Sequence, residues 1–231
     1  MVTAIILAAG RGERLRTRVS KPLVKLAGKP LLCHSIETLS RCSQVKNLVL
    51  VVNEHNRRVV ERLVKKNAYT KVGAIVLGGQ RRQDSVKNAL AHCGSSSLVL
   101  VHDAARPFIA GQVLSHLLHA ARKYSAAIPA VPVKATVKEV SGALGRREVK
   151  RTVERCGLWE VQTPQVFEKN LILEAYRRFN GQDVTDDAAL VEKLGVAVQV
   201  VPGSYAQIKV TTPEDLIIAE AIAAHRASFG L

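Results

Sequence analysis

Aromatic residues make up only 4% of this chain of 231 residues, and tryptophan occurs once. Proteins that hold single-stranded nucleic acid stack its bases on aromatic rings, so this scarcity argues against that class. Cysteine is scarce too. The four cysteines, Cys33, Cys42, Cys93 and Cys156, are far apart and form no CxxC pair. This spacing argues against a zinc site and a disulfide framework, and it suits the reducing cytoplasm.

Long hydrophobic runs are also missing. No stretch approaches the ~20 apolar residues of a membrane-spanning helix. The N-terminal run VTAIIL, residues 2–7, is too short for a signal peptide, and its arginines follow it instead of preceding it. No helical pattern combines a basic face with an aromatic one. We therefore expect a cytoplasmic protein without a membrane partner.

Acidic residues are heavily outnumbered. Asp and Glu number 19 against 34 Lys and Arg, which gives a formal net charge of +15. Such a surplus attracts nucleic acid, anionic lipid or phosphorylated small molecules, although it can also be a solubility trait. The length and the 47% hydrophobic content suffice for a sizeable core, and we expect one domain over residues 1–231.

Short apolar runs alternate with longer helical patterns along the chain. Strands are predicted at residues 2–7, 47–53, 72–77, 97–103, 126–131 and 197–201. Helices are predicted near 30–42, 54–66, 84–93, 110–124, 168–179 and 185–194, with a last one capped by Thr212. Strands that are apolar on both faces and separated by helices are typical of a doubly wound, mostly parallel α/β sheet.

Residues 134–156 interrupt this alternation. Two charged, strand-like runs flank the turn signal SGALG and predict a β-hairpin. A hairpin with so few apolar residues is marginal by itself. We therefore expect this protruding arm to pack on a partner.

The stretch LAAGRGERLRTRVSK, residues 7–21, follows the first strand. Ala8, Ala9, Gly10 and Gly12 let backbone N–H groups approach a phosphate, and five cations follow or interrupt them: Arg11, Arg14, Arg16, Arg18 and Lys21. A tight turn with solvated arginines is the structural alternative, but glycines together with cations favour a nucleoside triphosphate site.

Two further loops follow predicted strands. In GGQRRQDSV, residues 78–86, Ser85 can bind a ribose or base, or Asp84 or Ser85 can simply cap a helix. In VHDAARP, residues 101–107, Asp103 and Arg106 lie at the carboxyl edge of the sheet, where ligands of such sheets bind. These two can also merely pair with one another, and His102 is expected to be a packed residue.

Six motifs in order carry a family resemblance: LAAGRGERLRTRVSK, RRQDSV, HDAARP, TVERCGLWEVQTPQVF, VTDDAALVEKLG and IKVTTPEDL. Over nearly the whole chain they resemble the 2-C-methyl-D-erythritol 4-phosphate cytidylyltransferases, the IspD family of isoprenoid biosynthesis. The resemblance implies a Rossmann-like nucleotidyltransferase that transfers CMP from CTP to methylerythritol phosphate and releases pyrophosphate. It also implies Mg²⁺ held mainly by the CTP phosphates, and a homodimer formed through the 134–156 arm.

The resemblance further assigns roles to residues. It implies that Arg14 and Lys21 are the catalytic cations. The implied nucleotide-binding residues are Ala8, Ala9, Gly10, Gly12, Gly79, Ser85 and Ala104. The implied substrate-binding residues are Asp103, Arg106, Thr136, Arg155, Thr163, Thr185 and Lys209, with Thr136 and Arg155 carried by the arm into a second subunit. Three positions depart from the family pattern: Ser20-Lys21-Pro22, Ala135 and Gln207.

Two alternatives remain open at this stage. A ribitol 5-phosphate cytidylyltransferase shares the first loop and the HDAxRP-type motif, although Ala105 and Arg155 favour the methylerythritol enzyme. A basic nucleic-acid-binding protein, with the arm following a phosphate backbone, is a remote alternative, since aromatics are few and the enzyme motifs are complete. We therefore expect no nucleic-acid partner, and a gel-shift measurement distinguishes this class.

Overall fold

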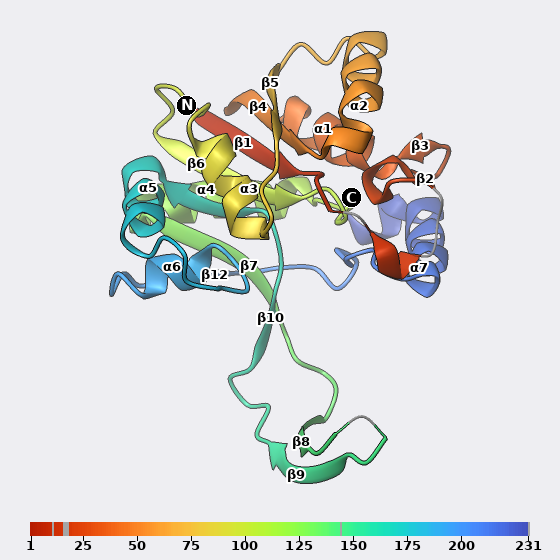
Figure 1. Ribbon diagram of the computed structural model, residues 1–231, viewed down its shortest axis with the longest axis vertical. Coiled ribbons are helices and arrows are strands. Elements are labelled where there is room, and N and C mark those ends of the chain that lie inside the picture. Colours follow the sequence, from red (N-terminus) through yellow and green to blue (C-terminus); the bar gives the residue numbers. More distant parts are fainter. Residues whose placement is uncertain (11, 16–18, 144, 231) are drawn as a thin grey trace.

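A computed structural model describes residues 1–10, 12–15, 19–143 and 145–230. Its centre is an eight-stranded sheet in the order β10-β7-β11-β6-β1-β4-β5, with β12 paired to β7 (Figure 1). Six strands run in one direction: β1 (Val2–Leu7), β4 (Val45–Val52), β5 (Val72–Leu77), β6 (Leu98–Asp103), β7 (Ala126–Pro132) and β12 (Gln199–Pro202). The predicted mostly parallel sheet is confirmed.

Two short strands, β10 (Trp159–Val161) and β11 (Gln165–Glu168), run against the others. The sequence did not predict them. β11 lies between β6 and β7, so the chain returns from the arm into the middle of the sheet. Their few residues depend on neighbouring strands for hydrogen bonds, and a window of three or four residues carries little periodicity of its own.

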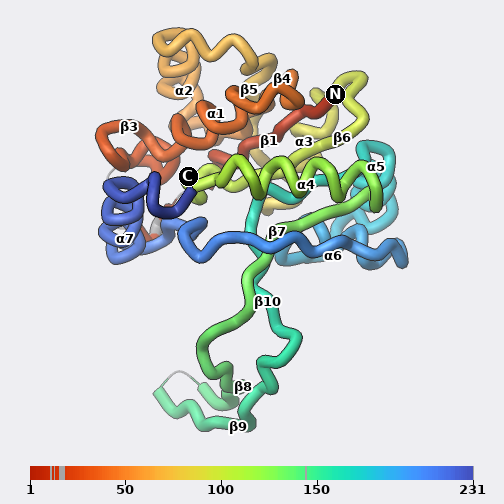
Figure 2. Tube along the Cα trace, turned by 180° about the vertical axis from the view of Figure 1, so that it is seen from behind, coloured from red at the N-terminus to blue at the C-terminus, as the bar shows by residue number. Residues whose placement is uncertain are grey.

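Helices cover both faces of the sheet. They are α1 (Leu31–Arg41), α2 (Glu54–Lys66), α3 (Arg82–Leu90), α4 (Gly111–Tyr124), α5 (Lys169–Arg178) and α6 (Ala188–Glu192), whereas α7 (Pro213–Ala224) packs beside the sheet. Side chains of β1 alternate between the two layers, because Ile6 packs with α1, α2 and α4 while Ile5 packs with α3, α5 and α6. Figure 2, which views the protein from behind, shows α1 and α4 in front of the sheet.

Smaller elements complete the chain. Single turns of 3₁₀ helix lie at η1 (Glu13–Leu15), η2 (Lys21–Leu23) and η3 (Arg226–Phe229), and β2 (Lys25–Leu26) pairs with β3 (Lys29–Pro30). α7 packs on this region through a third apolar cluster that includes Leu26. The predicted cap of α7 is present, because Asp215 N donates to Thr212 Oγ1 and Thr212 N donates to Asp215 Oδ2 at 2.8 Å.

One predicted helix has wrong bounds. Only Ala188–Glu192 of the expected 185–194 segment is helical, and Asp187 is its N-cap residue. Thr185 therefore lies in the loop before α6. The reason is that Gln165 Oε1 accepts from the N–H groups of Asp187 and Ala188. This side chain satisfies the free N–H groups at the start of the helix, so no earlier helical turn is needed.

The predicted arm projects from the body of the protein. β8 (Val137–Ser141) and β9 (Glu148–Val153) form an antiparallel hairpin, far below the sheet in Figures 1 and 2. Its valines face solvent in part, with Val140 50% and Val149 61% exposed. Among the described residues, no helix combines the length and the apolar character that crossing a membrane requires.

Candidate active site

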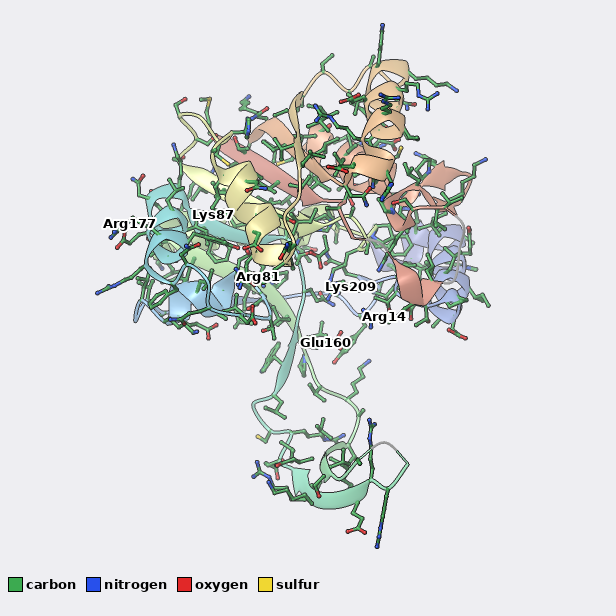
Figure 3. All side chains as sticks on the ribbon, viewed as in Figure 1. Arg14, Arg81, Lys87, Glu160, Arg177 and Lys209 are labelled. Carbon is green, nitrogen blue, oxygen red and sulfur yellow. The ribbon has the colours of Figure 1, made fainter. Side chains whose placement is uncertain are left out.

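A cavity of about 1100 Å³ opens where β1, β4, β5 and β6 end. Loops that follow these strands line it, as expected for an open α/β sheet. Its described lining carries five cationic side chains, Arg14, Lys21, Arg81, Arg82 and Lys209, against the two carboxylates Glu54 and Asp103. Figure 3 labels Arg14, Arg81 and Lys209, which belong to three separate segments of the chain. The arrangement favours a polyanionic ligand.

The first loop supplies one wall, through Ala8, Ala9, Gly10 and Gly12. Two asparagines hold this wall from behind: Asn56 Nδ2 donates to Ala8 O and Asn53 Nδ2 donates to Ala9 O, both at 3.0 Å. Asn53 is also the N-cap of α2. The carbonyls of Ala8 and Ala9 thus point toward these asparagines, and the wall itself carries only small side chains.

Gly12 lies directly against Lys21. Its backbone φ is +72°, and a Cβ at this position would lie 2.4 Å from Lys21 Cβ. Only glycine adopts this conformation freely and leaves this space. The glycine therefore places the stem of Lys21 against the loop.

Lys21 has an unusual electrostatic environment. Burial, with the nearby cations Lys209 and then Arg14 acting in the same direction, lowers its pKa to about 8. Binding of an anion would stabilise the charged form of such a lysine, because it would offset the repulsion from the neighbouring cations. Three cations of the predicted basic stretch, Arg11, Arg16 and Arg18, lie outside the described residues.

The second loop forms the opposite wall, with Gly78, Gly79 and Ser85 in the lining. The predicted capping role of Asp84 is confirmed, because it is the N3 residue of α3 and its side chain accepts from the N–H of the N-cap residue Arg81. Ser85 is not part of that cap. Ser85 Oγ instead accepts from Gly79 N at 3.1 Å, and Asp84 Oδ2 accepts from Arg81 N at 3.1 Å. A Cβ on Gly78 would lie 2.7 Å from that of Ala9, so the two loops touch.

Asp103 stands at the floor of the cavity, at the end of β6. Its Oδ2 pairs with Lys209 Nζ at 2.7 Å, and its Oδ1 pairs with Arg82 Nε at 3.3 Å. Burial alone would raise its pKa, but Arg82 and then Lys209 outweigh that effect and hold the pKa below its usual value. The carboxylate is therefore ionised throughout the neutral range.

The structural alternative, in which Asp103 pairs with Arg106, is absent from the ion pairs of the described residues. The Arg106 guanidinium is buried and donates to two main-chain carbonyls instead, with Nη1 to Gln207 O at 3.0 Å and Nη2 to Val161 O at 3.3 Å. It thereby ties the base of the arm to the segment that carries Lys209. Buried carbonyls without another donor compete strongly for such a group.

His102 is fully buried, as expected for a packed residue, but it also orders its surroundings. Thr163 Oγ1 accepts from Asp103 N at 3.1 Å, so its proton is directed to His102 Nδ1 at 3.0 Å. Nε2–H then donates to Arg106 O at 3.0 Å. Burial lowers the pKa of His102 to about 4, so the ring stays neutral and keeps this tautomer.

Several predicted site residues lie apart from the cavity. Thr136 and Arg155 lie on the arm, exposed, and Arg155 Nη1 donates to Lys134 O. Thr185 is exposed in the loop before α6. Ala104 is buried, and its neighbour Ala105 is the residue that lines the cavity. One chain does not bring the arm residues together with Lys21.

Four residues of this region were missed by sequence reasoning: Asn53, Asn56, Arg82 and Asp187. Asn53 offered a signal, since it is the last residue of the predicted strand 47–53 and so lies at the same sheet edge as the other loops. Arg82 stood within the quoted motif RRQDSV, but its partners lie 21 and 105 positions further along the chain, with Asp187 at 2.8 Å. Nothing local indicates such pairs.

No group of three or more His, Cys, Asp or Glu side chains suited to a metal ion occurs within the described ranges. Both Asp103 oxygens are occupied by ion pairs. The donor set of this cavity thus fits a metal ion that arrives with a phosphate ligand better than one bound by the protein alone.

Comparisons with known proteins agree on one family. The family model described as 2-C-methyl-D-erythritol 4-phosphate cytidylyltransferase matches residues 2–225. The chain is 44% identical to the protein of that name from Geobacillus kaustophilus over 225 residues, which cover 96% of this chain and 97% of that one.

Solved structures resemble it as well. The 4-diphosphocytidyl-2C-methyl-D-erythritol synthase of Anaerococcus prevotii superposes with a TM-score of 0.82 at 32% identity, covering 96% of each chain. The Thermus thermophilus 2-C-methyl-D-erythritol 4-phosphate cytidylyltransferase superposes with a TM-score of 0.77 at 32% identity, covering 97% of this chain and all of that one.

Proposed function

Because the chain belongs to the 2-C-methyl-D-erythritol 4-phosphate cytidylyltransferase family, we propose that it transfers CMP from CTP to 2-C-methyl-D-erythritol 4-phosphate. The products are 4-diphosphocytidyl-2-C-methyl-D-erythritol and pyrophosphate. The observation that carries this proposal is the cavity itself, in which a small-residue loop and five described cations, against two carboxylates, lie at the carboxyl edge of the sheet. We propose that residues 1–231 act as a single nucleotidyltransferase domain.

In this reaction a phosphate oxygen of the acceptor attacks the α-phosphorus of CTP. A new P–O bond forms while the bond to the departing pyrophosphate breaks in line with it. A phosphate monoester is largely ionised near neutral pH, so no general base is required. The protein has to align two anions that repel each other and to neutralise charge that develops on the α-phosphate. We assign that task to Arg14 and Lys21, and their position in the lining of the cavity supports the assignment.

The nucleotide occupies the two glycine loops in this proposal. Backbone N–H groups of Ala8, Ala9, Gly10 and Gly12 bind phosphate oxygens. The cytidine lies by the second loop, at Gly79 and Ser85, and Ala104 and its neighbour Ala105 border the nucleotide from the β6 end.

The acceptor lies on the Asp103 side of the cavity. Lys209 neutralises its phosphate, while Asp103 orients that lysine and accepts from acceptor hydroxyls. Arg106 and Thr163 support this side from behind through buried hydrogen bonds. Thr185 contributes from the loop before α6.

A divalent cation, Mg²⁺ in the family, would be held mainly by the CTP phosphates in this proposal. When bound it supplies charge neutralisation to the triphosphate. The protein residues around it are the cations and backbone amides already named, and the Asp103 carboxylate stays within its ion pairs.

We further propose a homodimer through the 134–156 arm. Apolar side chains are exposed along the arm and its base, including Leu158 at 37%, Trp159 at 45% and Tyr205 at 46%. Side chains of this size gain from burial against a partner, and a lone two-stranded hairpin is marginally stable. In the dimer, Thr136 and Arg155 of one subunit complete the acceptor site of the other.

Mixed dimers test this sharing. Lys21→Ala and Arg155→Ala homodimers each have a defect in both sites, whereas a mixed dimer collects both defects in one site and none in the other. After random exchange half of the dimers are mixed, so about a quarter of all sites are intact. Activity recovers toward a quarter of the wild-type value if sites are shared. Activity at the average of the two mutants, with exchange verified by a tagged pull-down, means that Arg155 serves its own chain or none.

The reaction is tested by pyrophosphate release from CTP with methylerythritol 4-phosphate and ribitol 5-phosphate in parallel. The first acceptor is expected to be used far more efficiently, and a preference for ribitol 5-phosphate contradicts the proposal. The four cysteines are free, which suits the cytoplasmic location we propose.

A further inference from the structure

Arg82, the first residue of α3, connects three separate segments beneath the cavity. Its Nε lies 3.3 Å from Asp103 Oδ1 at the end of β6, and its Nη1 lies 2.8 Å from Asp187 Oδ2 before α6. The Asp187 side chain has no exposed surface, and that of Asp103 is 11% exposed. One guanidinium is therefore held between two buried carboxylates.

Asp187 is itself firmly placed. Its Oδ1 accepts from the Tyr176 hydroxyl of α5, and its N–H donates to Gln165 Oε1 of β11 at 3.2 Å. Asp103 has no such anchor for its carboxylate, whose two oxygens meet only Arg82 and Lys209 among the described ion pairs. Asp187 thus positions Arg82, Arg82 positions the carboxylate of Asp103, and Asp103 in turn positions Lys209.

Arg82 also stands where the two halves of the site meet. Arg82 lies next to the second loop, with Gly78 and Gly79, on one side of the cavity lining. Asp103 and Lys209 lie on the acceptor side. Replacing a buried ion pair by apolar groups is often neutral for stability, so stability alone does not require such a cluster. The ion pairs of Arg82 with Asp103 and Asp187 instead connect the second loop rigidly to the end of β6 and to the segment before α6.

We propose that Arg82 is a positioning residue, which holds the Asp103 carboxylate against Lys209 and sets the spacing between the nucleotide loop and the acceptor side. This inference rests on the proposed function in one respect, the assignment of Asp103 and Lys209 to the acceptor. Arg82 itself need not touch either substrate, since it acts through the orientation of Asp103.

The test compares Arg82→Lys with the wild type. A lysine keeps the charge but its single nitrogen cannot reach both carboxylates in the same way. We expect kcat/KM for the acceptor to fall by ~10²-fold, as for a misplacement of about 1 Å, while KM for CTP changes little. Arg177→Lys is the matched control, because that guanidinium also binds a carboxylate, Glu174, but on the exposed surface of α5. Equal, small effects in both variants overturn the proposal.

A double-mutant cycle identifies the route of action. In an Asp103→Asn background, adding Arg82→Lys is expected to cost little more, since the group on which Arg82 acts is already altered. Losses that multiply show that Arg82 acts independently of Asp103 and overturn the proposal. The acceptor in these assays is whichever of the two sugar-alcohol phosphates the wild type uses, so a wrong acceptor does not affect this outcome.

A measurement without turnover separates this inference from the proposed reaction. The variant Arg82→Met with Asp187→Asn removes both charges of the buried pair and leaves neither unpaired, which protects folding. The carboxyl ¹³C signal of Asp103 then reports its titration. We expect its pKa to rise toward the usual range, because the cation that most lowers it is gone. An unchanged pKa means that Arg82 does not control Asp103.

Discussion

Lys21 is expected to give the enzyme a basic limb in its pH profile. Its pKa lies near 8 in the free protein, and the proposed role of Lys21 requires the protonated form. A lysine with a lowered pKa is charged below that value and loses its charge as the pH rises through it. About nine-tenths of the molecules carry the charge at pH 7 and about one-tenth at pH 9. We therefore predict that kcat/KM for CTP falls about tenfold between these two values.

The assay is pyrophosphate release over pH 7 to 10, where the phosphates of both substrates are already ionised. Lys21→Arg keeps a positive charge across this range, so its profile is expected to stay flat. Lys21→Ala is expected to lose ~10²- to 10³-fold in kcat with a smaller change in KM for CTP, since the charge acts mainly in the transition state. A flat wild-type profile to pH 10, or a limb near pH 8 retained in Lys21→Arg, refutes the reasoning.

Three further outcomes are expected. CTP is used in strong preference to UTP, because backbone carbonyls near Gly79 would accept from the cytosine amine and stay unpaired against uracil; equal rates contradict this. Gly12→Ala lowers kcat/KM for CTP, since its Cβ would lie 2.4 Å from Lys21 Cβ at φ +72°; wild-type kinetics exclude this packing role. His102, neutral in the fold, destabilises it as the pH falls from 6.5 toward 4, by about 3 kcal/mol in all; denaturant unfolding of His102→Asn should lack this acid-dependent part, and an identical pH dependence contradicts it.

The sequence by itself determined the architecture and the family. Apolar runs on both sheet faces, separated by amphipathic helices, lead to parallel strands with covered faces, because unpaired backbone groups and apolar side chains leave few alternatives. The six ordered motifs then indicated the family that the comparisons identify. Small residues followed by cations pointed to the first loop, since both properties belong to the residues themselves and need no distant partner.

Only the tertiary structure decided which groups meet. Arg106, three positions from Asp103, turns to the carbonyls of Gln207 and Val161, while Asp103 pairs with Arg82 and Lys209 from distant segments. Proximity along the chain says little about an ion pair, because the direction of each side chain and the loss of water around it set its partner. Burial also set the titration of Lys21 and His102. The burial of these side chains and the direction in which they point are set only when the sheet, including strand β11, and the helices are assembled.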